Sequence, residues 1–359
     1  MAYTTVDDPT IFFTANKYTG SSGSQTFNLG FQPDWIWTKN LNTGYNHVVV
    51  DSVRGNTKVL VPNGTNSEGT ATDAITAFTS TGYTVGANTS SGGFEDDFNG
   101  TYNSPSYITW NWKAGTTSGI SGSPSITPSG YSFSQTAGFS IIAYTGNNTV
   151  GATIPHGLGV APAVIIFKRR DASNEKWSTY HHKAAASSPE DVHLELNDTT
   201  AASNDDSILN DTAPSSTLIT MKTSSSVNSN SIKYVAYCFS EIQGYSKHGS
   251  YEGNGNAYGP FIYTGFRPAW VMTKSIDTTS NWNIFDNKRS TFNDVDDYIK
   301  ANANAGHDTG SSDIQMDFLS NGFKIRGNND EVNGSETFIY MAFAESPFVN
   351  SKSVPTNAR

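Results

Sequence analysis

The residues that could do chemistry in this 359-residue chain begin with its acidic clusters. They are Glu95-Asp96-Asp97, Asp205-Asp206, and Asp294 with Asp296-Asp297. Paired carboxylates cleave glycosidic bonds when they are held across a cleft with separated pKa values. Each cluster lies in polar, turn-like sequence, which predicts solvated loops. Asp96, Asp97 and Asn99 could offer oxygen atoms to Ca²⁺, but the alternating ligand pattern of a calcium loop is missing.

Histidine and cysteine give no clear site. His181 and His182, with His193 twelve residues later, could ligate a metal. Adjacent residues of a strand point to opposite faces, so packing at a surface or an interface is the expected role of the pair. Cys238 is the only cysteine and lies in a hydrophobic run, which predicts an inert buried thiol. We therefore expect no catalytic residues, no metal site, no cofactor and no enzymatic activity.

Two Asp-x-x-Arg pairs, Asp51 with Arg54 and Asp286 with Arg289, recur at matching places. A charge-assisted hydrogen bond within each pair would pin a loop. Contact with a ligand is the alternative interpretation. Gly253-Asn254-Gly255 opens no helix of a βαβ unit and is expected to be a turn instead of a phosphate loop.

Six tryptophans could stack on sugar rings, because amphipathic aromatic side chains are common at binding surfaces. They are Trp35, Trp37, Trp110, Trp112, Trp270 and Trp282. Side chains alternate along a strand, so Trp35 and Trp37 share one face. Their repeated strand positions favour a place in the core over contact with a glycan or an interface. Loops rich in Asn, Ser and Tyr are better candidates for recognition.

The elements that must position these residues recur three times along the chain. A Tyr-x-Gly motif precedes each copy, at Tyr18, Tyr144 and Tyr251. A proline then introduces an apolar-dominated run, and a lysine follows the proline by six positions. These pairs are Pro33 with Lys39, Pro162 with Lys168, and Pro268 with Lys274. Each copy closes on an aromatic run that ends at Trp112, Phe239 or Phe343.

The runs are short, aromatic and β-branched, and Gly, Asn, Ser and Pro bound them, which is typical of strands. We predict an all-β chain of three tandem antiparallel β-sandwich modules, jelly-roll-like in architecture. The first module covers residues 1–115, the second and divergent one 137–244, and the third 245–349. Residues 116–136, rich in Gly, Ser, Thr and Pro, are expected to form a flexible linker. Residues 350–359 form a C-terminal tail.

The composition bounds the partners. Charged residues make up 15% of the chain and the formal net charge is −10, which disfavours binding to nucleic acid. The N-terminus lacks the basic start and apolar stretch of a secretory signal, and no apolar run is long enough for a membrane span. We therefore expect synthesis in a cytoplasm, no membrane insertion, and release by assembly or cell lysis.

Several phrases of the chain resemble a family of uncharacterised virion proteins of tailed phages, especially those that infect marine cyanobacteria. The phrases are Tyr3-Thr4-Thr5-Val6-Asp7-Asp8-Pro9, Asp51-Ser52-Val53-Arg54-Gly55, Trp110-Asn111-Trp112-Lys113-Ala114-Gly115, His156-Gly157-Leu158-Gly159, Tyr245-Ser246-Lys247-His248-Gly249-Ser250-Tyr251 and Pro260-Phe261-Ile262-Tyr263-Thr264-Gly265-Phe266-Arg267-Pro268. The resemblance implies a phage structural protein, either tail-fibre-like or capsid-decorating. It supplies no catalytic residues.

The hypothesis that follows is a virion protein in an exposed appendage, a tail fibre or spike, that attaches to the host surface. Its expected partners are other virion proteins, further copies of itself in a homotrimer, and a host glycan. Capsid decoration, as a cement or head-fibre protein that stabilises the particle, is the alternative. An enzyme that degrades polysaccharide is the interpretation that the residues support least.

Overall fold

The aromatic and β-branched runs form strands, and these strands fall into three groups along the chain. The computed structural model describes residues 3–21, 23–42, 44–87, 96–100 and 105–356. Every pairing between named strands in this part is antiparallel. The α-helices described are single turns, and none is long and apolar enough to cross a membrane. The predicted all-β class is confirmed.

No sheet mixes strands from two groups. The first module has a large sheet in the order β1 (Phe13–Thr19), β9 (Ser106–Trp112), β3 (Trp35–Asn40), β4 (His47–Asp51). Its smaller sheets are β2 (Gln25–Asn28), β8 (Gly82–Val85), β7 (Ile75–Thr79), and β5 (Lys58–Val59) with β6 (Gly69–Thr70). The 3-10 turn η1 (Pro9–Ile11) and the helix α1 (Asp96–Asn99) complete it.

The second module has a large sheet in the order β10 (Gly130–Ser134), β11 (Phe139–Thr145), β18 (Lys233–Phe239), β13 (Val164–Arg169), β14 (Ser178–His181), β15 (Val192–Glu195), β16 (Ser203–Asn204). Its small sheet pairs β12 (Ala152–Pro155) with β17 (Leu218–Met221), and η2 spans Pro189–Asp191.

The third module has a large sheet in the order β19 (Ser246–Glu252), β26 (Thr337–Pro347), β21 (Phe266–Ser275), β22 (Asn283–Asp286), β23 (Tyr298–Lys300). Its small sheet is β20 (Phe261–Tyr263), β25 (Gly322–Ile325), β24 (Met316–Leu319), and its helix is α2 (Asp330–Asn333).

The expected linker 116–136 is partly strand. Strand β10 lies inside it and pairs with β11, and Thr116 and Phe133 exchange backbone hydrogen bonds of 2.9 and 3.0 Å. The Gly and Ser content of this stretch hid the strand. The alternation of Tyr131, Ser132 and Phe133 is the signal that indicates it.

The central strands of each large sheet are buried on both faces. In β3, the side chains of Trp35 and Trp37 belong to a cluster at the centre of the molecule, while Ile36 belongs to the core of its own module. Strands covered on both faces are apolar along their whole length instead of alternating with polar residues. This explains the unbroken apolar runs after each repeated proline.

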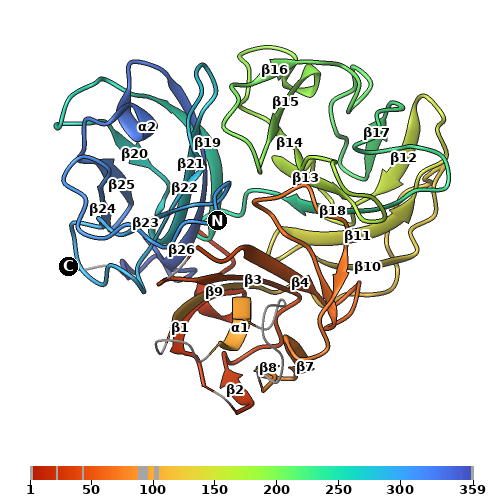
Figure 1. The fold of residues 1–359 in the computed structure, drawn as a ribbon. Helices are drawn as coiled ribbons and strands as arrows, with labels where there is room; N and C mark the ends of the chain where they lie inside the picture. Colours follow the sequence, from red (N-terminus) through yellow and green to blue (C-terminus); the bar gives the residue numbers. More distant parts are fainter. Residues whose placement is uncertain (1–2, 22, 43, 88–95, 101–104, 357–359) are drawn as a thin grey trace.

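The three modules meet in one aromatic core. Figure 1 shows them as three lobes, red to orange, yellow to green, and blue, around a common centre. Trp35 of the first module stacks on Tyr237 of the second at 4.8 Å between ring centroids, and Trp112 meets Trp270 of the third at 5.7 Å. The six tryptophans predicted for the core are 2% exposed or less, which rules them out as sugar platforms.

Equivalent residues close the contacts between modules in a ring. Asp51, His181 and Asp286 lie opposite the second residue after each repeated proline. Each contacts the next module: Asp51 accepts from the Tyr237 hydroxyl at 2.7 Å, Asp286 accepts from the Trp110 indole at 3.1 Å, and His181 Nε2 contacts the Tyr340 carbonyl at 3.2 Å. The same edge of each module therefore contacts its neighbour, which is how a heterologous interface closes into a ring.

A second set of equivalent residues lies four positions earlier and contacts the other neighbour. Trp177 donates to the Val61 carbonyl at 2.9 Å, and Trp282 donates to the Glu195 carbonyl at 3.0 Å. In the first module His47 occupies the equivalent position. Its Nδ1 accepts a hydrogen bond from the Trp37 indole, so the ring proton is on Nε2, which donates to the Lys300 carbonyl at 3.1 Å. Burial holds the pKa of His47 well below its usual range, which keeps this ring neutral.

The Tyr-x-Gly motif joins the large sheet of each module to the helix or turn that precedes its closing strand. The tyrosine hydroxyl donates to a buried carbonyl in three equivalent pairs, Tyr18 with Phe98, Tyr144 with Val227, and Tyr251 with Val332, at 2.6, 2.7 and 2.7 Å. The motif glycine is needed for this approach, since a Cβ on Gly20 would lie 2.2 Å from the Gly100 carbonyl oxygen. The motif glycine therefore recurs at a position where two backbone segments lie too close together for a side chain.

The repeated lysines, Lys39, Lys168 and Lys274, are fully buried. Each ammonium group donates to the loop after its strand, for example Lys168 to the Glu175 carbonyl at 2.6 Å and Lys274 to the Ser280 hydroxyl at 3.2 Å. Burial lowers the pKa of Lys168 and of Lys274 to about 8.

The shared core predicts that the chain unfolds as one unit. Trp112→Ala should lower the free energy of unfolding by about 3–5 kcal/mol, because it removes a 1% exposed indole from the centre. Guanidinium unfolding followed by fluorescence and by circular dichroism should show a single transition. In the variant, the midpoint of this transition should shift to a lower guanidinium concentration. Phe292→Ala, at a 77% exposed residue, is the control and should displace nothing. Separate transitions, with only the first module affected, would contradict a common core.

The buried lysines predict a pH dependence. The pKa of Lys274 is about 8 when folded and about 10.4 when unfolded, so the unfolded chain binds more protons between these values. The free energy of unfolding of the wild type, relative to Lys274→Met, should therefore rise from pH 8 to 10, by at most about 1.4 kcal/mol per pH unit. Urea titrations across this range measure it, with Lys352→Met as the exposed control. A difference that stays constant with pH would refute the expectation.

Candidate functional site

Asp205-Asp206 and Asp294 with Asp296-Asp297 lie in loops, as predicted, whereas Asp96 and Asp97 begin the helix α1 instead of lying in a loop. Glu95 and the side chains of Asp96 and Asp97 lie outside the described residues. Asp206 pairs with Lys222 at 2.5 Å, and Asp205 accepts from the Ser207 amide at 2.8 Å. Asp205 is thus bound within its own loop, whereas Asp206 pairs with a lysine that directly follows β17.

Asp294 has a partner that the sequence did not indicate. Burial, and then a hydrogen bond with Asp317, raise the pKa of Asp294. Asp317 also accepts from Arg326 Nε at 2.5 Å. A neighbouring carboxyl group favours the protonated form of Asp294, because two like charges close together are costly.

The histidines and the cysteine face the interior. His182 Nε2 lies 2.6 Å from the His248 carbonyl, and His181 contacts the third module, so both pack at an interface as predicted. Among the described residues, no group of three or more His, Cys, Asp and Glu side chains could hold a metal ion. Cys238 is buried in β18, and burial raises the pKa of its thiol to about 12.

The two Asp-x-x-Arg pairs pin their loops, as predicted. Arg54 Nε lies 2.5 Å from Asp51 Oδ2, and Arg289 Nε lies 2.6 Å from Asp286 Oδ2. Their side chains are 0% exposed, so contact with an external ligand is excluded. The contacts of both aspartates with a neighbouring module were not predicted.

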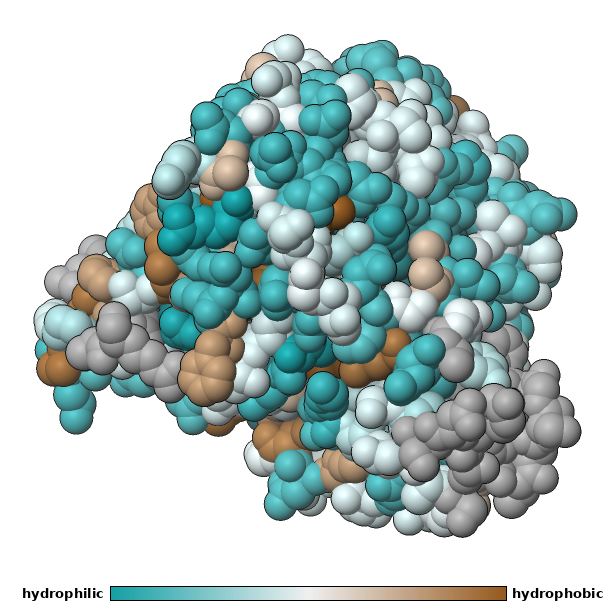
Figure 2. Space-filling view, turned by 60° about the vertical axis from the view of Figure 1, so that its left-hand side comes forward, coloured by the Kyte–Doolittle hydropathy of each residue, from teal (hydrophilic) through white to brown (hydrophobic). Residues whose placement is uncertain are grey.

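The exposed aromatic side chains gather on the third module. Among the described residues they are Tyr258, Phe261, Tyr263 and Phe292, with 79%, 45%, 54% and 77% of their surface exposed. Figure 2 shows this side of the molecule turned forward, with brown groups set among teal ones. Exposed aromatic side chains that gather on one part of a molecule are candidates for contact with a ligand or partner.

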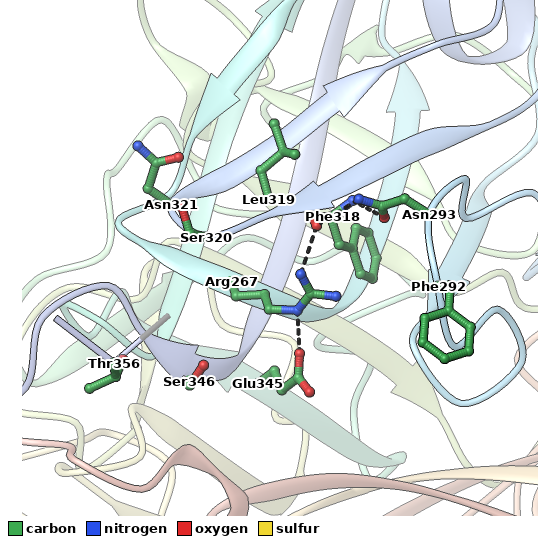
Figure 3. Close-up of a pocket in the computed structure, with 10 residues that line it drawn as sticks. All are labelled: Arg267, Phe292, Asn293, Phe318, Leu319, Ser320, Asn321, Glu345, Ser346 and Thr356. Atoms are coloured by element: carbon green, nitrogen blue, oxygen red, sulfur yellow. Dashed lines mark hydrogen bonds and ion pairs between the residues drawn. The ribbon is translucent and has the colours of Figure 1, made fainter. Parts of the chain in front are cut away.

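A cavity of about 710 Å³ opens beside Phe292 (Figure 3). Its lining comes from β21, β26, the β24–β25 turn, the loop after β22, and the C-terminal segment. The residues are Arg267, Phe292, Asn293, Phe318, Leu319, Ser320, Asn321, Glu345, Ser346 and Thr356. The volume falls within the range of about 300–1,000 Å³ that is usual for small-molecule sites.

An extension of two strands places the charged pair of this cavity. Strands β3 and β13 begin after the repeated proline, whereas β21 begins before Pro268 and pairs with β26 through a bulge. Arg267 and Glu345 lie in this extension, with Arg267 Nε 2.5 Å from Glu345 Oε2. Arg267 also donates from Nη1 to the Phe318 carbonyl at 3.0 Å. The guanidinium is therefore fixed in direction.

Asn293, the residue after Phe292, fixes the loop that carries Phe292 through its side-chain amide. The Asn293 amide donates to the Phe318 carbonyl at 3.1 Å and accepts from the Phe318 N–H at 2.9 Å, as a paired strand would. On the opposite side, the Asn321 carbonyl accepts from the Thr264 and Gly265 amides at 3.0 and 3.1 Å. Both walls of the cavity are thus fixed before any ligand binds.

Sequence reasoning did not find this cavity. Gln32 and Ala161 occupy the place of Arg267 in the other modules, and Ala114 and Glu241 occupy the place of Glu345. The signal available in the sequence was that the third copy differs from the other two at these positions. The cavity in this form is specific to the third module.

Comparison with known proteins places the chain in a family and identifies no activity. Residues 8–347 match the family described as "Domain of unknown function (DUF7483)". No curated protein and no solved structure matches the chain. The chain belongs to the DUF7483 family.

Proposed function

We propose that the chain is a structural protein of a tailed-phage virion that forms part of an exposed appendage and attaches to the host surface. The observation that carries attachment is the concentration of exposed aromatic side chains and of the Arg267–Glu345 cavity on one module. The resemblance of the repeated phrases to phage virion proteins supports the location on a particle.

The architecture is consistent with different roles for the three modules. The common core joins the three modules into one body, so the first two modules serve as a rigid support for the third. A fixed recognition surface loses little conformational entropy on binding. Copies of such a body on one particle would add weak contacts through effective concentration.

Capsid decoration is the second candidate, and the ring of three modules favours it. A body with three similar lobes around one axis matches a local threefold position on a shell. A polysaccharide-degrading enzyme has the least support, because Asp206 pairs with Lys222 and Asp205 accepts from the Ser207 amide, so both carboxylates are used within the fold.

Purified virions test the proposal. Mass spectrometry should find the chain in the particle, and particles that lack it should keep intact heads while adsorption to host cells falls about tenfold or more. Normal adsorption with heads that break on mild heating would favour capsid decoration instead. Absence of the chain from virions would overturn both.

The expected homotrimer stays a prediction, because a single chain does not test it. The inner face of each large sheet is already covered by the other two modules, so a trimer would have to form through outer surfaces. We expect the purified protein to have the mass of three chains in light scattering. A mass of one chain would contradict the homotrimer.

A further inference from the structure

The ring of Phe292 is an aromatic surface without an intramolecular use. It is 77% exposed, and in the described part of the chain it packs against no other aromatic ring. Its loop is fixed by Asn293 and by Ser290, whose hydroxyl accepts from the Asp297 amide at 3.0 Å. A fixed, exposed aromatic face is suited to stacking on a flat, weakly polar surface of a ligand.

The charge balance of the cavity selects against ions. Arg267 and Glu345 neutralise each other at 2.5 Å, so the pair offers no net charge. An anion would meet the Glu345 carboxylate, and a cation would meet the Arg267 guanidinium. The chain as a whole carries a formal net charge of −10, which further disfavours an anionic ligand.

The polar groups of the cavity also select against a purely apolar ligand. Such a ligand would bury Arg267 and Glu345 without replacing the hydrogen bonds that water gives them, which is costly. Glu345 keeps 38% of its side chain exposed, so its carboxylate can accept further hydrogen bonds. The Asn321 amide adds both a donor and an acceptor. Figure 3 shows Arg267 and Glu345 lying between Phe292 on one side and Asn321 on the other.

We propose that this cavity binds a neutral saccharide, with one sugar ring stacked on Phe292 and neighbouring hydroxyls bound by the Arg267–Glu345 pair and Asn321. A sugar has an apolar C–H face and hydroxyl groups that both donate and accept, which matches this combination of groups. The inference rests on the proposed attachment function and names the ligand class of its site.

The test uses the purified full chain and an array of neutral, sialylated and sulfated oligosaccharides, followed by titration calorimetry with the best neutral one. Binding to neutral oligosaccharides is expected. Phe292→Ala should weaken it about tenfold or more, and Phe292→Trp should retain it. Glu345→Gln, which keeps the shape but breaks the charge pair, should also weaken it. Tyr258→Ala removes an equally exposed aromatic outside the cavity and should change nothing.

Each other outcome overturns the proposal. These outcomes are no retained oligosaccharide, retention of the sialylated or sulfated ones alone, or equal binding by wild type and Phe292→Ala. Thermal melting of each variant checks that the fold is intact. The array is independent of the particle, so saccharide binding by a chain that is absent from virions would refute the proposed function and leave this inference standing.

Discussion

The whole structure depends on burial of one aromatic core by three sheets at once. Each large sheet has one face packed on its own small sheet and the other on the centre, where Trp35, Trp112 and Trp270 meet. Burial of apolar surface stabilises the fold by roughly 25 cal/mol per Å². A module on its own would expose its central aromatic face to water and would lose this stabilisation. The modules are therefore repeats in sequence but parts of a single cooperative structure.

The ring explains why the second module diverges from the other two. Asp51 and Asp286 accept from side-chain donors, Tyr237 and Trp110, on the neighbouring module. At the matching place of the third module stands Met341, which has no such donor. An aspartate facing it would be buried without a partner. His181 fits instead, since burial lowers its pKa to about 3 and the neutral ring contacts the Tyr340 carbonyl.

The sequence was sufficient for the parts of the fold that local pattern decides. The repeated proline, apolar run and lysine predicted the strands, and Asp51 with Arg54 was near enough in sequence to be read as a pair. The residues that cover Trp35 could not be predicted, because they come from distant parts of the chain. Tyr237, which stacks on Trp35, also donates a hydrogen bond to Asp51, 186 positions away in the sequence. Residues 116–136 were misread as flexible throughout, since β10 is too short to dominate its composition.

The same physics explains where recognition can arise. A residue that faces the common core contacts other modules, so a change there disturbs packing in more than one lobe. Positions beyond the core are free of that constraint: Arg267 and Glu345 stand where the other copies have Gln32 and Ala114, or Ala161 and Glu241. Extending β21 and β26 past Pro268 was enough to bring the two together. A binding cavity on one lobe is thus the kind of difference that this ring tolerates best.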